Sequence, residues 1–416
     1  MSRRTGQEPT RRGMLRLAGM GLGLAALGAG AWGCGPEEQP PGRGGSGPAP
    51  GTTPGTGTGG DADAFTTPPP GTAPRPLWQA ASPAGITSRL AALAVAGDVV
   101  LVSGDPLIGR DLATGKERWR RAGVAVPGAD LLVSGGTLFL ASAEYDGDVV
   151  GLDPATGRET WRSRLGSDRF AQPRPIAVDD RHVYVLAGIL DEDFRTRTNV
   201  IAAIDTGSGK VAWQERRDLG TEEWGITAAV DGPHLVYTDY RKNLTVRDAA
   251  SGRQRWTKKI GDSNSRRLAV HDGLVIVADG QRLRAFAVAD GTERWSLKAE
   301  DFWRFRDPVV LDGVLYVSDS AHVLRAVDPV RGRELWRNDQ LLDVAVPWQY
   351  AKVGGTLYAA TELDSKGGVL ALDARDGRLR WTYNDGSKAL DKWYVVASGK
   401  RLAALHGTRL TALPAV

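Results

Sequence analysis

The acidic and histidine side chains are the residues of this chain that could do chemistry, and their spacing argues against a catalytic centre. Asp239, Asp279 and Asp319 recur at one register, as a cation site would require, but aspartates that open turns explain the same recurrence. The cluster Asp191-Glu192-Asp193 lacks calcium-loop spacing, and the five histidines lack zinc spacing. No phosphate-binding glycine loop or nucleophile elbow occurs in the sequence. The sequence therefore predicts no catalytic residues and no metal ligands.

Cys34, the only cysteine, is the one residue with a predicted covalent modification. It ends the apolar run of residues 17–33, which Arg11 and Arg12 precede. Residues 10–16 resemble a twin-arginine export signal, and the residues before the cysteine resemble a lipobox. We predict a lipoprotein signal peptide over residues 1–34, with lipidation at Cys34 and export through Arg11 and Arg12. The alternatives are an unpaired thiol in a removed signal peptide and a membrane helix, for which 17 residues with six glycines are a poor match.

Residues 35–76 have the composition of a disordered tether. Of these 42 residues, 22 are glycine or proline. Such a segment could hold a folded domain away from a bilayer that the lipid on Cys34 anchors. The charge balance also changes once processing is considered, because residues 1–34 hold five arginines and one glutamate, which accounts for the whole formal charge of +4. The remainder is neutral, so the sequence predicts no nucleic-acid partner.

A nine-residue frame, first seen as DPATGRETW at residues 153–161, organises the rest of the chain. It recurs seven times, with a glycine four residues before each tryptophan and an aspartate eight residues before it in six copies. Ala287 is the exception to the aspartate. A repeat with this period indicates an array or a propeller. The tryptophans of the seven frames are Trp119, Trp161, Trp213, Trp256, Trp295, Trp336 and Trp381.

The residue types of the frame fit a tight turn between two strands. An aspartate that opens a turn accepts hydrogen bonds from the amides ahead of it, and glycine supplies a positive φ. Tryptophan is too large to be exposed seven times at one register, so each indole should pack on a neighbouring unit. The residue two positions before the aspartate is small in most copies, which leaves room for an indole. This pattern resembles the tryptophan-docking repeat of the PQQ-like β-propellers, in which the indole docks between adjacent blades.

The number of units predicts the fold class. Eight second strands align along the chain, while the frame with tryptophan appears seven times. Trp78 has no turn before it, and the chain ends where the eighth turn would begin. We therefore predict an all-β domain over residues 77–416, an eight-bladed β-propeller of four-stranded antiparallel blades. The N-terminal strand is expected to close the last blade, which removes the open edges of an unclosed array.

Candidate binding residues lie on one face of the predicted ring. In a four-stranded meander the second turns and the blade-to-blade links share a face, and these segments vary most, including the expected loop at residues 188–199. Their aromatic and arginine residues are typical of binding surfaces, although the aromatics could equally fill the core. The partner-binding candidates are Trp303, Arg304, Phe305, Arg306, Trp348, Tyr350, Trp393 and Tyr394.

Two functions from different classes fit these observations. The first is a non-enzymatic, exported lipoprotein that binds a protein, a peptide or an envelope polymer and is expected to be a monomer at the cell surface or in the periplasm. Blade number, repeat and lipid anchor resemble the BamB-like lipoproteins of outer-membrane barrel assembly; the export signal and the long tether do not. The second is a quinoprotein dehydrogenase using pyrroloquinoline quinone and calcium. A resemblance to that family would imply long insertions over the propeller, which this chain lacks. We therefore expect no cofactor.

Overall fold

The computed structural model describes residues 63–82, 92–125, 129–142, 148–166, 170–193, 195–217, 226–239, 241–261, 268–341, 346–362 and 365–416. Arg11, Arg12 and Cys34 lie outside these residues, as do the predicted signal peptide and most of the predicted tether. The described chain is all β apart from the single 3₁₀ turn η1 (Asp63–Phe65). Its strands form eight separate four-stranded sheets, which confirms the predicted fold class.

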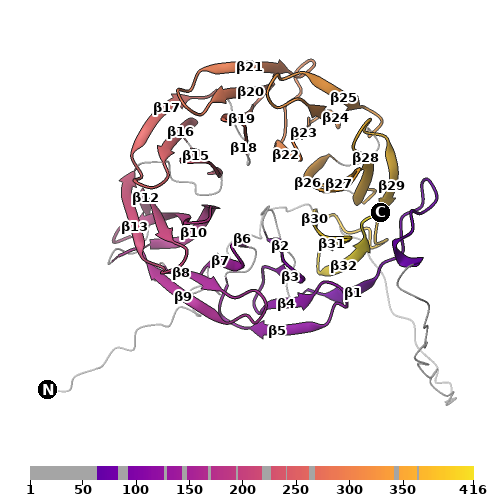
Figure 1. The fold of residues 1–416 in the computed structure, drawn as a ribbon, viewed down its shortest axis with the longest axis horizontal. Coiled ribbons are helices and arrows are strands. Elements are labelled where there is room, and N and C mark those ends of the chain that lie inside the picture. The colour runs from indigo at the N-terminus through magenta and orange to yellow at the C-terminus, as the bar shows by residue number, and fades with distance from the viewer. Residues whose placement is uncertain are drawn as a thin grey trace, which may run out of the picture. The chain divides into compact units, whose positions relative to one another are not determined.

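The first four blades follow the chain in order from the inner to the outer strand (Figure 1). Blade 1 contains β2 (Leu93–Ala96), β3 (Val99–Val102), β4 (Leu107–Asp111) and β5 (Glu117–Arg121). Blade 2 contains β6 (Leu132–Ser134), β7 (Thr137–Ala141), β8 (Asp148–Leu152) and β9 (Glu159–Arg164). Blade 3 contains β10 (Phe170–Val178), β11 (His182–Leu190), β12 (Thr196–Asp205) and β13 (Val211–Arg217). Blade 4 contains β14 (Ala228–Asp231), β15 (His234–Thr238), β16 (Asn243–Asp248) and β17 (Gln254–Lys259).

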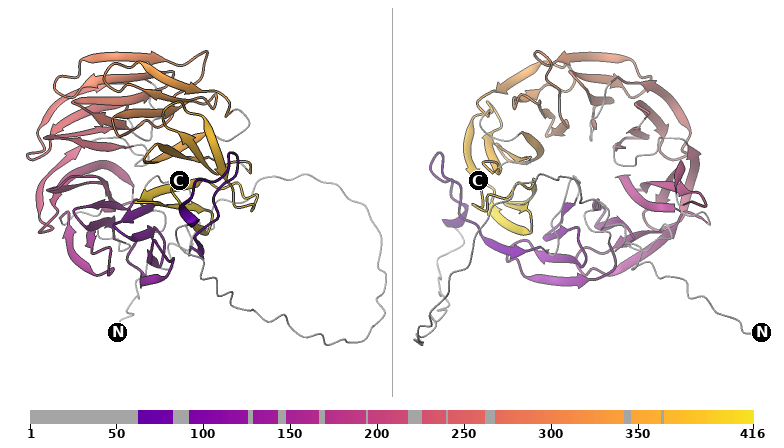
Figure 2. Two further views of the ribbon diagram at one scale, coloured as in Figure 1. Left: turned by 45° about the vertical axis from the view of Figure 1, so that its right-hand side comes forward. Right: turned by 180° about the vertical axis from the view of Figure 1, so that it is seen from behind.

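The remaining blades complete a ring, seen from behind in Figure 2. Blade 5 contains β18 (Leu268–His271), β19 (Leu274–Asp279), β20 (Arg282–Ala287) and β21 (Glu293–Lys298). Blade 6 contains β22 (Val309–Leu311), β23 (Val314–Ser318), β24 (Leu324–Val327) and β25 (Glu334–Asn338). Blade 7 contains β26 (Pro347–Val353), β27 (Thr356–Thr361), β28 (Val369–Asp373) and β29 (Leu379–Tyr383). Blade 8 contains β30 (Trp393–Ser398), β31 (Arg401–His406), β32 (Arg409–Pro414) and β1 (Trp78–Ala81).

The N-terminal strand closes the ring as predicted. β1 pairs antiparallel with β32, and Trp78 lies opposite Ala412. Blade 8 therefore joins the two ends of the chain and has no covalent turn between its third and fourth strands. In every other blade the tryptophan also lies opposite a small residue or Val246, on the strand just before the turn.

Seven indoles cross from one blade to the next in the same way. In the next blade, an aspartate (Ala287 in blade 5) opens the third turn. Each Nε1 donates a hydrogen bond of 2.7–2.9 Å to the carbonyl of the residue directly after it. Each ring also covers the turn glycine of that blade, where an added Cβ would lie only 2.5–3.2 Å from an indole atom. The tryptophan–glycine pairs are Trp78–Gly115, Trp119–Gly157, Trp161–Gly209, Trp213–Gly252, Trp256–Gly291, Trp295–Gly332 and Trp336–Gly377.

The turn that receives the indole is fixed by its aspartate and its glycine. In blade 1 the Asp111 carboxylate accepts hydrogen bonds from the amides of Ala113 and Thr114, and the Gly115 amide donates to the Asp111 carbonyl. Gly115 has a φ of 72°, which favours glycine there over any residue with a side chain. Ala287 keeps the backbone hydrogen bonds of this turn without a carboxylate at that position, and Asp290 accepts from the Thr292 amide as Thr114 accepts from the Lys116 amide in blade 1.

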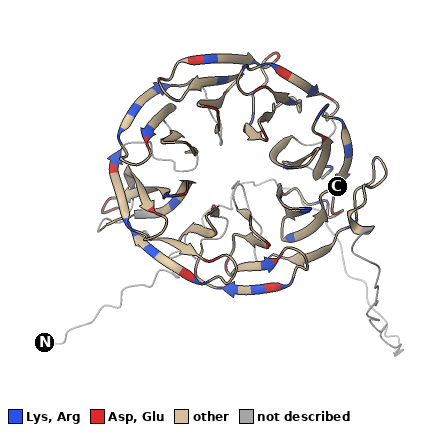
Figure 3. Cartoon of the chain, viewed as in Figure 1, with Lys and Arg blue, Asp and Glu red and all other residues tan. Residues whose placement is uncertain are grey.

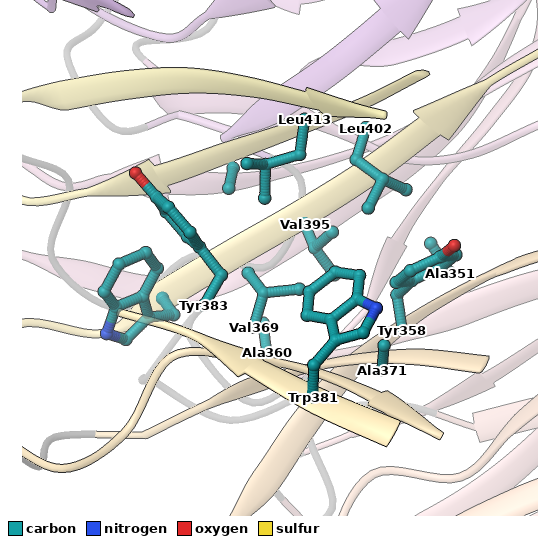
Figure 4. Close-up of a cluster of buried hydrophobic side chains, with 12 residues drawn as sticks. Ala351, Tyr358, Ala360, Val369, Ala371, Trp381, Tyr383, Val395, Leu402 and Leu413 are labelled. Carbon is teal, nitrogen blue, oxygen red and sulfur yellow. The ribbon is translucent and has the colours of Figure 1, made fainter. Parts of the chain in front are cut away.

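Trp381, the tryptophan of the seventh frame, faces no such turn, because β1 supplies the outer strand of blade 8 and no covalent turn joins it to β32. It is buried against blade 8 in a cluster that contains Val395, Leu402 and Leu413 (Figure 4), and its Nε1 has no hydrogen-bond partner among the described residues. The segment before β1 helps to cover this side of blade 7, since the Gly71 amide donates to the carbonyl of Arg380. The hydrophobic core as a whole lies between neighbouring blades, in eight clusters of this kind.

The segment at residues 188–199 differs from the expected loop. It is mostly an extension of the β11–β12 hairpin, in which Gly188 pairs with Asn199 and Ile189 with Thr198. The irregular part is reduced to the turn after Leu190, where the Asp191 carboxylate accepts hydrogen bonds from the amides of Asp193 and Arg195. Residues with high β propensity flank the short acidic turn, Ile189 on one side and Thr196 and Thr198 on the other, which explains why pairing continues to the end of the surplus.

Truncating a docking tryptophan should destabilise the domain. We expect Trp336→Ala to cost roughly 3–5 kcal/mol, because it removes a packed ring and its hydrogen bond to Ala374. Leu335→Ala in the same strand is the control, since Leu335 is 45% exposed. Thermal melts followed by circular dichroism measure both. Equal melting temperatures for the two variants would contradict the docking role.

The turn aspartates should make the domain sensitive to acid. The hydrogen bond from Arg118, with those from Thr114, holds the pKa of Asp111 at about 2, below its ordinary 3.8. Hydrogen bonds from Ser251 and from Arg375 likewise lower the pKa values of Asp248 and Asp373. A carboxylate with a lowered folded-state pKa stabilises the fold above its unfolded pKa and loses that contribution as the pH falls. Melting temperature should therefore drop between pH 3.8 and about 2, and less steeply in Asp111→Asn.

Candidate functional site: the loop face

The two faces of the ring differ in regularity. The turn face is formed by the first and third turns of each blade. There the third turn donates to the first turn: the Leu112 amide to the Asp98 carbonyl in blade 1, and the Ala249 amide to the Pro233 carbonyl in blade 4. The opposite face, here called the loop face, carries the second turns and the blade-to-blade links. Trp303, Arg304, Phe305 and Arg306 lie in one of these links. The other four candidates lie in inner strands, Trp348 and Tyr350 in β26 and Trp393 and Tyr394 in β30.

The link between blades 5 and 6, residues 299–308, is fixed at both ends by backbone hydrogen bonds. The Ala299 and Phe305 amides donate to the carbonyls of Gln281 and Gly280 in the second turn of blade 5. The Arg306 amide donates to the Ser318 carbonyl of blade 6, and Phe305 forms a β-bridge with Asp319. The link is therefore held as part of the scaffold.

The tip of this link presents an aromatic ring to solvent. Phe302 is 70% exposed, and its ring lies 4.7 Å from that of Trp303, which is half-buried. Asp301 just before it has a φ of 49°, a left-handed conformation that turns the chain at the tip. Arg304 is exposed, while Phe305 is buried beneath the guanidinium of Arg325 at 5.5 Å. Aromatic and arginine side chains on a fixed backbone are typical anchors of protein interfaces.

Ion pairs join this link to blade 7 and to the link between blades 7 and 8. Glu362, in the second turn of blade 7, lies 3.5 Å from Arg306 and 3.4 Å from Lys392. The Lys392 ammonium also lies 4.6 Å from the centre of the Trp348 ring. Leu390, in the link that holds Lys392, is 67% exposed. These contacts place parts of two links and one second turn close together on the loop face.

Five of the eight candidates are core residues, which is the alternative in which these aromatics fill the core. Trp348 is 2% exposed, and its Nε1 donates to the carbonyls of Thr361 and Trp393. It packs edge-on to Tyr394 and so fills the space between blades 7 and 8. Because the five core residues are buried, a partner could not contact them directly. Of the eight candidates, only Trp303, Arg304 and Arg306 are accessible. The five are Phe305, Trp348, Tyr350, Trp393 and Tyr394.

The sequence did not predict Phe302 as a candidate binding residue. A sequence pattern distinguishes buried from exposed aromatic residues at only some of these positions. Trp348 and Tyr350 alternate within β26, which identifies them as one face of a strand. Phe302 precedes a half-buried tryptophan in a link with no strand period, and no sequence pattern tells which of two adjacent rings faces outward.

Two of the recurrent aspartates, Asp239 and Asp319, serve the second turns of their blades, whereas the Asp279 carboxylate accepts from the Gly261 amide and from Arg284. The Asp239 carboxylate accepts hydrogen bonds from the Asn243 amide and side chain. Asp319 accepts from the amides of Ala321 and Val323 and pairs with Arg325 at 2.5 Å. In blades 5 and 6 an interior arginine bridges this aspartate to a glutamate of the outer strand, forming the sets Asp279–Arg284–Glu293 and Asp319–Arg325–Glu334.

Ser387, His406 and Asp385 lie together, but their geometry is not that of a catalytic triad. Both Asp385 Oδ2 and Ser387 Oγ approach the same nitrogen, Nδ1 of His406, at 3.0 and 3.4 Å. A general base for serine would instead meet the hydroxyl through Nε2. Burial alone would raise the pKa of Asp385, but hydrogen bonds from Ser387 and His406 outweigh it and lower that pKa. The cluster therefore fixes the link before β30.

Two further findings concern metals and membranes. Within the described residues, no group of three or more histidine, cysteine, aspartate or glutamate side chains could hold a metal ion. No helix in the described part of the chain has the length and apolar character needed to cross a bilayer.

A closed ring of eight four-stranded blades, locked by tryptophans that dock on the next blade, defines a PQQ-like β-propeller. The family model described as outer membrane protein assembly factor BamB matches residues 72–192, 197–304 and 301–408. These ranges cover most of the chain, so the protein belongs to this family.

Relatives in sequence are distant. The chain is 24% identical over 240 residues to the outer membrane protein assembly factor BamB of Yersinia pestis, a match that covers 50% of this chain and 59% of that protein. It is 29% identical over 156 residues to the serine/threonine-protein kinase AfsK of Streptomyces griseus, which covers 34% of this chain and 19% of the kinase. The chain thus spans less than two thirds of the length of both relatives.

Solved structures share the fold at low identity. BamB from Moraxella catarrhalis superposes with a TM-score of 0.57 at 15% identity, covering 82% of this chain and 99% of that structure. The quinohemoprotein alcohol dehydrogenase from Comamonas testosteroni gives a TM-score of 0.57 at 11% identity, covering 82% of this chain and 76% of that one. At these identities the likeness describes the fold alone.

Substituting Trp348 and Trp303 should show which of the two is a core residue, through the change in melting temperature. Trp348→Ala should lower the melting temperature by several degrees, because it leaves a cavity and removes a donor from two buried carbonyls. Trp303→Ala should lower it much less, since Trp303 is half-buried. A melt of both variants in one buffer makes the comparison, and a larger loss for Trp303→Ala would reverse the assignment.

Proposed function

We propose that the protein is a non-enzymatic, exported lipoprotein that binds a protein or peptide partner through its loop face. The observation that carries the proposal is the link of residues 299–308, whose ends are hydrogen-bonded to two blades while Phe302 stands 70% exposed at its tip. Because the backbone is already ordered, little conformational entropy is lost when a partner covers the ring. A protein partner also agrees with the relative from Yersinia pestis, which is an outer membrane protein assembly factor.

The accessible residues around Phe302 fit this role. The Trp303 ring lies 4.7 Å from that of Phe302, and Arg304 adds a charged group that can bind a carboxylate of the partner. The ion pairs of Glu362 with Arg306 and Lys392 hold the neighbouring segments in place. We infer a monomeric, membrane-anchored domain that uses no cofactor and does not bind nucleic acid.

Partner binding is tested with a photo-crosslinking amino acid at position 302 in living cells. We expect a discrete crosslinked product that disappears when Arg304→Ala is added, while the melting temperature is unchanged. The matched control places the same crosslinker at Val330, which is 43% exposed in the third turn of blade 6 on the turn face. Products of equal yield at both positions would contradict the loop face as the binding face.

Export and anchoring are tested separately. Changing Arg11 and Arg12 to lysine should leave full-length precursor in the cytoplasm, and Cys34→Ser should release the protein from membranes or leave it unprocessed. Cell fractionation with palmitate labelling measures both outcomes. Palmitate on the Cys34→Ser variant in wild-type amounts would rule out lipidation at this residue.

The dehydrogenase alternative is tested with the purified protein. When it is mixed with pyrroloquinoline quinone and calcium and then desalted, we expect no quinone absorbance to remain with the protein. Retained absorbance together with oxidation of an alcohol would replace a binding role with an enzymatic one.

A further inference from the structure

One position on the outer strands is basic in four consecutive blades. Three residues after the docking tryptophan stand Arg164 in blade 2, Arg216 in blade 3, Lys259 in blade 4 and Lys298 in blade 5, and all four are exposed. The equivalent residues of blades 1, 6, 7 and 8 are also exposed but not basic: Ala122, Asp339, Asn384 and Ala81. The four basic residues are called here the basic stripe.

The sheet registers place the stripe at one level of the rim. Arg164, Arg216, Lys259 and Lys298 lie opposite Asp148, Val200, Asn243 and Arg282, each of which is five residues before the first turn position of its blade. The stripe therefore runs along the ends of β9, β13, β17 and β21 that adjoin the loop face (Figure 1). The repeat of the blades gives its charges a regular spacing.

Protection of exposed strand edges does not explain the sign of these charges. Charged residues on an edge strand prevent pairing with other chains, but either sign serves that purpose. Here lysine and arginine predominate on the outer strands (Figure 3). The glutamates of β13 and β21 are engaged by interior arginines, Glu215 by Arg247 and Glu293 by Arg284. No described carboxylate lies within ion-pair distance of Lys259 or Lys298.

Blade 5 keeps an arrangement that costs stability without a ligand. Arg282 lies directly opposite Lys298 across the β20–β21 pair, and like charges in that position destabilise a sheet. Arg282 donates a hydrogen bond to Ser296 and has no carboxylate partner among the described residues. An anion bound between the two side chains would remove this repulsion.

We propose that the basic stripe binds a linear polyanion whose charges are repeated phosphate groups; since this rests on the proposed export of the protein, the polyanion is an envelope polymer and not a nucleic acid. The stripe bends around about half of the rim, since it follows four of eight blades, and a flexible polymer can follow such an arc. A flat anionic bilayer placed against the loop face would also meet the blades without a basic residue, including Asp339.

The test measures binding of long-chain inorganic polyphosphate to the full-length protein at low ionic strength. The double variant Lys259→Gln/Lys298→Gln should bind about tenfold more weakly, and binding should weaken with added salt. The matched control is Arg120→Gln/Arg337→Gln, which removes two exposed charges from outer strands of blades 1 and 6, and its affinity should stay close to wild type. Melting temperatures of both variants verify the fold.

Each other outcome overturns the assignment. Absence of polyphosphate binding, or equal losses in both double variants, would reduce the stripe to general surface charge. Tighter binding of poly-glutamate or of vesicles containing phosphatidylglycerol, lost in Lys259→Gln/Lys298→Gln, would assign the stripe to an acidic peptide or to the bilayer instead. Since neither double variant alters Phe302 or Arg304, the result is independent of the crosslinking test of partner binding.

Discussion

The ring depends on one repeated contact, an indole that lies over a glycine and donates a hydrogen bond to a carbonyl in the next blade. The contact needs a residue without a side chain beneath the ring, a left-handed turn to aim the carbonyl, and a small residue opposite the tryptophan. These requirements fall on a few positions of each repeat. The remaining positions are free to vary, which is why blades of different length close into one ring.

The same requirements explain what could be predicted from the sequence. The tryptophan, glycine and aspartate of each frame, such as Trp119, Gly157 and Asp153, recur at fixed spacing because each repeat supplies the same contact. Counting the frames and the second strands therefore predicted the number of blades and the closure by β1. The burial of Trp348 and Tyr394 depends on contacts between blades 7 and 8 far apart in the sequence, and no repeat encodes them. The exposure of Phe302 depends equally on how both ends of its link are held. The fold could therefore be predicted from the sequence, whereas the residues of the loop face that are exposed to solvent could not.

Interior arginines connect the scaffold to both proposed surfaces. Arg325 packs on Phe305 beneath the link that presents Phe302, and it also pairs with Glu334 of an outer strand. Arg284 holds Glu293 in the same way and leaves the basic residues of β21 without that counter-charge. Arginines that pair with these outer-strand glutamates thus connect a link on the loop face with the charge of the rim. A buried arginine whose partner is lost would retain an uncompensated charge, so these pairs are expected to change together in evolution.

Closure by β1 also determines when the domain can become complete. The strand that is synthesised first pairs with the strand that is synthesised last, and Gln79 forms a side-chain hydrogen bond with Tyr383, 304 residues away. Contacts of such sequence separation form slowly because a long loop must close before they contribute free energy. Blades 1 to 7 can assemble progressively as the chain emerges, each turn receiving the indole of the blade before it. Blade 8 cannot, so the nascent propeller remains an open arc until its final residues are available.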